Sequence, residues 1–170
     1  MIMKKIMMTL ATLFVAVCAS AQVYIGGGVG FANASDDDDS RFSWKISPEI
    51  GYQFNEKWDA GLAFGIEGIE DGDKTFEIAP YLRYTVCSAK IVDFFIEGTI
   101  GYAHYDRAKG YKDYDGFEIG LKPGVKVNLT NHLAFVTKIG FFGYQRLDDV
   151  NIWGANIDGR NILFGINYKF

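Results

Sequence analysis

The sequence predicts an all-β fold, an eight-stranded antiparallel up-and-down barrel. Three observations predict it. Apolar residues recur at every second position in eight separate segments, which is the period of a strand with one apolar face and one polar face. The connections between the segments alternate between short and long, and the last ten residues, NILFGINYKF, keep the period to the chain end. Because chain ends normally fray, we expect neighbouring strands to hold this last segment.

Each segment is named by the span of its apolar positions. The segments are Val23–Phe31, Trp44–Phe54, Trp58–Ile66, Phe76–Val86, Val92–Tyr102, Phe117–Leu129, Leu133–Phe141 and the closing decapeptide Asn161–Phe170. The connections after the second, fourth and sixth segments are short: Asn55–Lys57, Cys87–Lys90 and Thr130–His132. The other connections are longer and acidic. A barrel with short turns at one end and long polar loops at the other is typical of transmembrane barrels.

All three prolines of the chain stand at one position of this pattern. Pro48, Pro80 and Pro123 each precede the first residue of a short turn by seven residues, always in an even-numbered segment. A proline within a strand removes a backbone donor from the ladder, which is usually seen at edges or bulges. The recurrence predicts a bulge or bend in each even strand.

The N-terminus predicts export. Lys4 and Lys5 precede an apolar stretch, Ile6–Val17, and Ala19–Ala21 has the A-x-A pattern of a signal cleavage site. The stretch is too short to span a bilayer as a helix, which needs ~20 apolar residues. We therefore expect residues 1–21 to be cleaved and residues 22–170 to form a single outer-membrane barrel domain.

The composition of the mature chain argues against a nucleic-acid partner and against an internal disulfide. With Lys4 and Lys5 removed, 15 basic residues face 21 acidic ones, a net charge of −6, and nucleic acid is therefore not an expected partner. Cys87 is the only cysteine left after position 21, so the fold needs no internal disulfide.

The polar face of the segments predicts what lies inside the barrel. It carries seven acids, seven bases and many glycines, and the lumen of an eight-stranded barrel is only just wide enough for side chains. Small residues beside long charged ones would fit there, and each ion could find a partner. The expected lumen charge network consists of Lys45, Glu49, Glu77, Arg83, Glu97, Glu118, Lys122, Lys126 and Lys138, with Asp59, Glu67, Asp93, Arg160 and Lys169 on the same parity.

The apolar face then faces lipid. Strands of about ten to twelve residues, tilted, cover the ~25 Å apolar band of an outer membrane. A closed barrel satisfies every backbone group within lipid, so the first and last strands are expected to pair. Aromatic residues near strand ends are expected at the lipid boundary: Trp44, Tyr52, Trp58, Tyr84 and Tyr102.

With these features the chain resembles the small outer-membrane barrels of the OmpX and OmpA-transmembrane type. The matching C-terminal residues are Ile162, Ile166, Tyr168 and Phe170. The resemblance implies that they form the insertion signal read by the barrel-insertion machinery. It also implies a location in the outer membrane of a Gram-negative bacterium, among outer-membrane lipid and lipopolysaccharide, as a monomer without cofactor. OmpA's peptidoglycan-binding domain has no counterpart after this barrel, so no envelope tether is expected.

No catalytic, cofactor-binding or metal site is predicted. The glycine run at 26–30 continues a strand and does not open a helix, as a phosphate loop would. The acidic run Asp36–Asp39 is expected to be a solvated loop, with cation binding as the less favoured alternative. His104, with Asp106 two residues on, is expected to be an interfacial histidine, because no serine shares its strand.

The function predicted from the sequence is a non-enzymatic integral outer-membrane barrel with a charge-paired, plugged lumen. Its role would be envelope integrity or cell-surface interaction such as adhesion. Three alternatives stay open: a lipid A-modifying hydrolase using His104, a small pore, and a secreted lipocalin-like binder.

Overall fold

The structure, a computed structural model, describes residues 22–36, 39–69, 74–106, 113–147, 150–157 and 162–170. The predicted signal segment lies outside the described residues, as do Arg160 and the centre of the acidic run at 37–38. All regular elements of the described part are strands. No helix among these residues has the length and apolarity to cross a membrane.

Ten strands are assigned. They are β1 (Val23–Asp36), β2 (Asp39–Gln53), β3 (Trp58–Ile69), β4 (Lys74–Ala89), β5 (Val92–Asp106), β6 (Tyr114–Asn128), β7 (Leu133–Ile139), β8 (Phe141–Leu147), β9 (Val150–Asn156) and β10 (Ile162–Lys169). All pairings are antiparallel, and several strands are longer than the ten to twelve residues expected.

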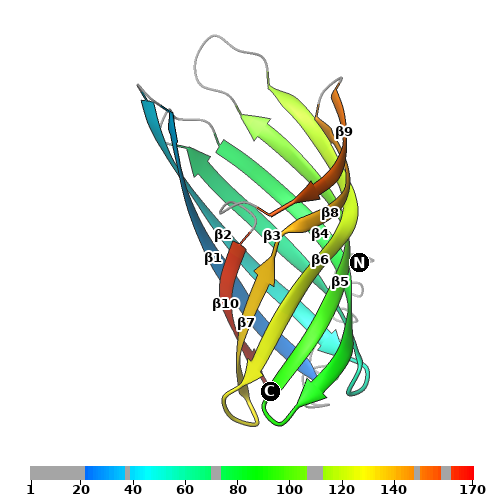
Figure 1. The fold of residues 1–170 in the computed structure, drawn as a ribbon. Coiled ribbons are helices and arrows are strands. Elements are labelled where there is room, and N and C mark those ends of the chain that lie inside the picture. The colour runs from blue at the N-terminus through cyan, green and yellow to red at the C-terminus, as the bar shows by residue number, and fades with distance from the viewer. Residues whose placement is uncertain (1–21, 37–38, 70–73, 107–112, 148–149, 158–161) are drawn as a thin grey trace, which may run out of the picture.

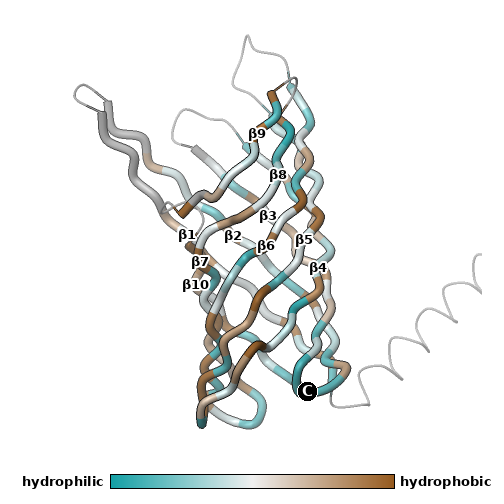
Figure 2. The backbone as a smooth tube through the Cα atoms, turned by 45° about the vertical axis from the view of Figure 1, so that its right-hand side comes forward, coloured by the Kyte–Doolittle hydropathy of each residue, from teal (hydrophilic) through white to brown (hydrophobic). Residues whose placement is uncertain are grey.

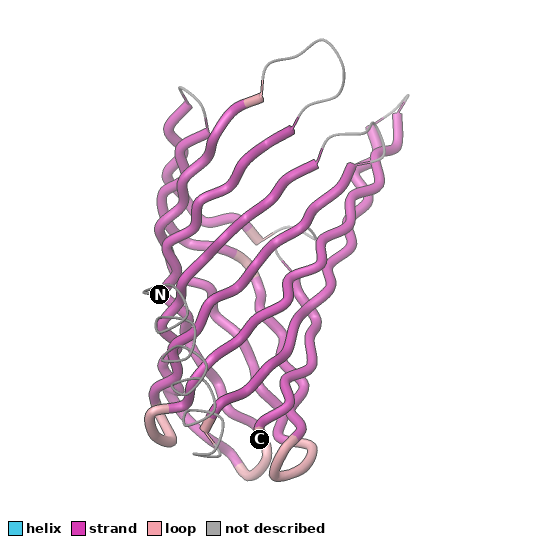
Figure 3. The backbone as a smooth tube through the Cα atoms, turned by 180° about the vertical axis from the view of Figure 1, so that it is seen from behind, coloured by secondary structure: helices cyan, strands magenta, loops and turns pink. Residues whose placement is uncertain are grey.

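The barrel closes with eight strands, as predicted. Around the end that carries the short turns, the order is β1-β2-β3-β4-β5-β6-β7-β10 and back to β1 (Figures 1 and 3). The chain end is held on both sides. Phe170 N donates to Val23 O at 3.1 Å, and Lys169 N donates to His132 O at 2.7 Å.

The seventh predicted strand is divided into β7 and β8 at Gly140, which has a φ of 76°. On β6, Gly124 pairs with Lys138 but Leu121 pairs with Phe142, so β7 and β8 together contain one extra residue, a bulge. The bulge reverses the alternation beyond it. Phe141, expected on the lipid side, instead faces inward with 3% of its surface exposed, and that expectation is wrong.

The eighth predicted strand, β10, is preceded by a further strand that the sequence pattern did not predict. The connection expected after the seventh segment contains β9, which pairs with β8. The sequence pattern missed β9 because its residues, VNIWGAN, are not strictly alternating. In the half of the barrel toward the long connections, the wall therefore runs β1-β2-β3-β4-β5-β6-β8-β9.

The prolines interrupt the ladder on one side only. Pro48 pairs with Gly27 of β1, and Pro80 pairs with Leu62 of β3, while the next strand lacks a partner at both positions. No register shift occurs at these two sites, so the bulge expected there is absent. The ladder instead lacks a pairing with the next strand at each proline, which we call a missing rung. Only at Pro123 does the ladder shift, opposite the bulge at Gly140.

The second short turn is shorter than predicted. β4 continues through Ala89, and the turn is made by Lys90 and Ile91, with Lys90 at a φ of 56°. Instead, a register shift lies between Thr85 and Cys87, within the strand. The turn therefore begins later in the chain than predicted, at Lys90 and not at Cys87.

The two faces of the wall are unlike. Side chains of the apolar parity point outward, for example Phe164 and Ile166, which are 50% and 53% exposed, whereas Glu97 points inward and is 3% exposed. Figure 2 shows the resulting alternation of apolar and polar residues along the strands. A lipocalin-like barrel would bury the apolar face, so that alternative is excluded.

Glycines make room for large side chains inside the barrel. Gly51 lies opposite Tyr24, Gly61 opposite Tyr81, and Gly124 opposite Phe95. In each pair, a Cβ on the glycine would collide with the ring of its partner. Further collisions of this kind involve polar or charged partners or the inward-turned ring, among them Gly26 with Asn167, Gly101 with Glu118, and Gly120 with Phe141.

Candidate functional site: the ion-paired interior

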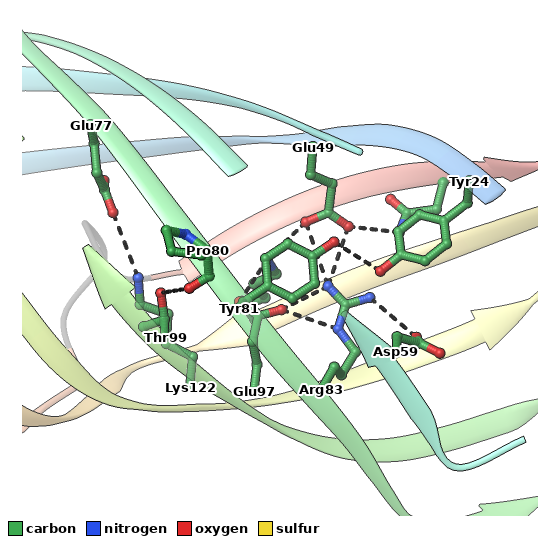
Figure 4. Close-up of polar contacts among 12 residues, drawn as sticks. Tyr24, Glu49, Asp59, Glu77, Pro80, Tyr81, Arg83, Glu97, Thr99 and Lys122 are labelled. Carbon is green, nitrogen blue, oxygen red and sulfur yellow. Dashed lines mark hydrogen bonds and ion pairs between the residues drawn. The ribbon is translucent and has the colours of Figure 1, made fainter. Parts of the chain in front are cut away.

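The centre of the barrel is filled by a cluster of ions, here named the central ion layer. It consists of Glu49 from β2, Arg83 from β4, Glu97 from β5 and Lys138 from β7 (Figure 4 shows the first three). All four are buried. Arg83 and Glu97 are direct neighbours across β4 and β5, which places the acid and the base on the same inward face.

Each ion of this layer has at least two partners. Arg83 Nη2 lies 2.7 Å from Glu97 Oε2 and 3.2 Å from Glu49 Oε1, and Arg83 Nε also donates to Glu97 Oε2, at 3.1 Å. Lys138 Nζ lies 2.9 Å from both Glu49 Oε2 and Glu97 Oε1. Asn167 of β10 adds a hydrogen bond of 2.7 Å to Glu49. The layer is thus a closed network of two acids and two bases.

Aromatic rings surround Arg83. Its guanidinium carbon lies 4.7 Å from the ring centroid of Phe95 and 5.0 Å from that of Tyr81. Tyr81 and Tyr24 are joined by a hydrogen bond of 2.8 Å between their hydroxyl oxygens. Cation–π contacts of this kind are worth about 2 kcal/mol when desolvated. The guanidinium is therefore held by aromatic rings as well as by its carboxylate partners.

A second group of ions lies toward the long connections. Lys45 Nζ contacts Glu77 Oε2 at 2.6 Å, and Lys122 Nζ contacts Glu118 Oε1 at 2.8 Å. Gln145 of β8 donates to Glu118 at 3.2 Å. We call the four charged residues, Lys45, Glu77, Glu118 and Lys122, the outer ion layer.

A third pair lies toward the short turns. Lys126 Nζ is 3.3 Å from Asp93 Oδ2, which also accepts a hydrogen bond of 2.8 Å from Asn128. The nine residues of the expected lumen network thus occupy three levels, and each has an oppositely charged neighbour. The three levels divide the interior along the barrel axis.

Among the described residues, small cavities border the central ion layer. At the level of the central ion layer, cavities of about 10 and 20 Å³ are lined by Glu49, Lys138 and Glu97 among others. A larger cavity of about 450 Å³ opens at the short-turn end, lined by polar residues including Asp59, Lys126 and Lys169. Arg83 Nη1 borders it without a hydrogen-bond partner, 4.0 Å from Asp59 Oδ2. This vestibule therefore ends at the central ion layer.

The predicted boundary aromatics lie on the outer face. Trp44, Trp58 and Tyr102 are exposed, and Tyr52 and Tyr84 are half-buried. Trp58 and Tyr84 pack together with ring centroids 4.7 Å apart. Of the C-terminal residues, Ile166, Tyr168 and Phe170 point outward along the last strand, and the Tyr168 and Phe170 rings pack edge to face at 5.4 Å.

His104 is placed differently from the sequence-based expectation. Its acidic neighbour is Asp115, directly across on β6, and not Asp106. His104 Nδ1 lies 2.9 Å from Asp115 Oδ1, and both side chains are exposed on the outer face. Among the described residues, no group of three or more His, Cys, Asp or Glu side chains could hold a metal ion.

Sequence reasoning missed four inward residues of the site. Tyr24, Tyr81, Phe95 and Asn167 all lie on the same parity as the glycines and charges, and each faces a glycine across the ladder. The signal that could have found them is this pairing of a large residue with glycine at one height in neighbouring strands, which requires the register to be known.

Fold and interior together define an integral membrane barrel with an apolar exterior and an ion-filled core. The chain belongs to the outer membrane protein beta-barrel domain family, whose model matches residues 7–170. This family places the barrel in an outer membrane. No match was found among curated protein sequences.

Solved structures show the same fold at low sequence identity. Neisserial surface protein A is 14% identical with a TM-score of 0.59, over 87% of this chain and 97% of that one. The N-terminal barrel domain of Pseudomonas aeruginosa OprF is 10% identical with a TM-score of 0.60, over 88% and 98%. OprG of the same organism is 13% identical with a TM-score of 0.55, over 88% and 96%.

Proposed function

We propose that this protein is a non-conducting, non-catalytic outer-membrane barrel that anchors a polar outer end at the cell surface, with residues 1–21 removed as a signal peptide. The observation that carries the proposal is the central ion layer. Glu49, Arg83, Glu97 and Lys138 meet across the lumen from four strands, and each is bound by two or more partners. A lumen filled in this way supports a structural role over a pore.

The outer end of the barrel supports a role in surface contact. β4 and β5 extend to Lys74 and Asp106, and β6 begins at Tyr114, whose ring stacks on that of Tyr105 with centroids 4.5 Å apart. Asp106, Asp113 and Asp115 are exposed there. Acidic side chains exposed in this way suit contact with a basic or cation-bridged surface.

The hydrolase alternative gains no support from His104. Its ring is held on the outer face by Asp115, and a serine hydrolase would need a serine hydroxyl on the other ring nitrogen. Mass spectrometry of lipid A from cells with and without the gene tests this alternative. Identical masses would support the proposal, and a gene-dependent loss of an acyl chain or phosphate would favour the hydrolase instead.

The pore alternative is tested by planar-bilayer recording of the purified, refolded barrel. We expect no stable conductance steps, because the cavities at the central ion layer are smaller than a hydrated ion. Reproducible single-channel steps from a preparation shown to be folded by its heat-modifiable gel migration would contradict the proposal.

The choice between surface contact and envelope integrity needs a variant that changes the outer end alone. The triple variant Asp106→Asn, Asp113→Asn, Asp115→Asn leaves the barrel interior untouched, and Glu56→Gln at the short-turn end is the matched control. A surface-contact role predicts lost cell adhesion with normal detergent resistance in the triple variant. Normal adhesion, combined with detergent sensitivity in a strain lacking the gene, would assign the protein to envelope integrity.

A further inference from the structure

The three prolines mark a level at which the barrel wall is incompletely paired. The pairing of each even strand with the next strand stops for two residues, the proline and the residue before it. These are Ser47–Pro48 toward β3, Ala79–Pro80 toward β5, and Lys122–Pro123 toward β7 and β8. Ser47, Ala79 and Lys122 all line one cavity of about 20 Å³, so the three interruptions lie at one height, which we call the proline level.

The pairings on the other side of the prolines continue through this level. Pro48 pairs with Gly27 of β1, Pro80 with Leu62 of β3, and Pro123 with Ile96 of β5, and the residues on either side of each pair are also in register. The wall at the proline level therefore contains three continuous ribbons, β1–β2, β3–β4 and β5–β6. The ladder from each ribbon to the next strand is interrupted there.

The interior is divided near the same height. Among the described residues, no ion pair joins the outer ion layer to the central ion layer. The 20 Å³ cavity lies between them, lined by Glu77 and Lys122 of the outer layer and by Glu97 and Lys138 of the central layer. Ion pairs therefore hold each layer together but do not brace the wall across the proline level.

One backbone group at this level is bonded from the interior instead of by the ladder. Thr99 Oγ1 donates a hydrogen bond to Pro80 O, at 3.4 Å (Figure 4). This bond is long for a hydroxyl donor, whose usual distance is about 2.7–2.8 Å. A rotatable side chain thus takes the place of a ladder bond between β4 and β5, and it holds the two strands together less firmly.

We propose that the proline level is a hinge, at which the outer half of the barrel moves relative to the half that carries the short turns. A region with fewer backbone hydrogen bonds opens at a lower free energy than the fully paired wall around it. The three ribbons keep the two halves connected, and the central ion layer, which begins at Glu49 beside Pro48, stays closed on the short-turn side. The hinge does not depend on the role proposed for the outer end.

Spin-label pairs on β2 and β6 test the hinge by pulsed electron paramagnetic resonance in bilayers, in a Cys87→Ser background. One pair, at Trp44 and Ile119, reports on the outer half. The matched pair, at Tyr52 and Val127, reports on the short-turn half. Each label lies four residues from the proline of its own strand and on the apolar, outward parity, so the interior is left unchanged.

We expect the distance distribution of the outer pair to be at least about twofold wider than that of the short-turn pair. The triple variant Pro48→Leu, Pro80→Leu, Pro123→Leu supplies the three missing N–H groups, and in it the two widths are expected to become equal. Heat-modifiable gel migration shows that each variant is folded. Equal widths in the barrel that keeps its prolines, or an outer distribution that stays wide in the triple variant, would overturn the proposal.

Amide hydrogen exchange of the unsubstituted barrel, followed by NMR, is a second test that needs no proline variant. Residues 64–65 and 100–101 lie opposite the interruptions in β2 and β4, whereas Ile96 and Glu97 are paired on both sides. We expect the faster amide of each of the two interrupted sites to exchange at least tenfold faster than those of Ile96 and Glu97. Equal protection at all these positions would contradict the hinge.

Discussion

Arg83 and Glu97 face one another directly across β4 and β5, and their side chains meet at 2.7 Å in the middle of the barrel. Both are at least 97% buried as side chains. A pair formed by register neighbours needs no loop to position it, because the two strands alone bring the charges together. The central ion layer is therefore built into the wall.

Removing one member of this pair is expected to be costly. Arg83→Met leaves Glu49 and Glu97 with Lys138 as their one remaining base, and an uncompensated buried charge costs about 3–5 kcal/mol. Urea unfolding in detergent micelles measures the loss, with exposed Lys57→Met as the control. An unchanged midpoint for the Arg83 variant would show that the layer contributes nothing to stability.

Replacing glycine inside the barrel tests the packing of rings across the ladder. In Gly61→Ala, the new methyl group collides with the Tyr81 ring and the backbone of β2, so we expect a loss of ~1–3 kcal/mol. Gly154→Ala is the matched control, because its Cβ points into open space. Equal unfolding midpoints for the two variants would contradict the proposed packing.

The missing rung at Pro80 allows a test in which the substitution is expected to strengthen the strand pairing. Pro80 O faces Thr99 of β5, so the missing donor at Pro80 N belongs to the same side of the strand. Pro80→Leu supplies an N–H toward β5 and keeps an apolar side chain facing outward. We expect slower amide hydrogen exchange around positions 79–81 and 99–101. Faster exchange there would show that the strand needs the proline.

The C-terminal residue is proposed to act in assembly more than in stability. Phe170 is half exposed at the barrel rim, so Phe170→Ser is expected to lower the amount of folded barrel in cells several-fold while the purified protein still folds in detergent. Phe54→Ser is the control, because Phe54 is also a largely exposed aromatic residue at the same end of the barrel. Equal amounts of the two variants in the outer membrane would remove the insertion-signal role from Phe170.

Strict alternation made most of the fold predictable. Segments such as the one from Val92 to Tyr102 have apolar residues at every second position except Gly98, and closure through β1 and β10 follows from the need to pair every edge in lipid. The break at Gly140 was not predictable in this way. A single extra residue reverses the alternation, and the pattern on either side of it is equally apolar, so the pattern predicts the wrong face for Phe141.

The partners within the interior needed the register. The sequence indicates that Glu49 and Lys138 share the lumen parity, but 89 residues separate them, and only the pairings around the whole barrel bring them to one height. His104 illustrates the same limit, because its acid lies across the ladder at Asp115 and not two residues along the chain. The face on which a residue lies can be read from its own segment, whereas its height in the barrel depends on the register of all the strand pairs.

The central claim is that lipid contacts one face of each strand and that ions fill the other. The most direct test places nitroxide labels on β6 at Glu118, Ile119, Leu121 and Lys122, one at a time in a Cys87→Ser background, and measures collisions with oxygen and with a water-soluble nickel chelate in bilayers. The account predicts high oxygen contact and low nickel contact at Ile119 and Leu121, with low contact for both reagents at Glu118 and Lys122. High nickel contact at Ile119 and Leu121 would contradict it.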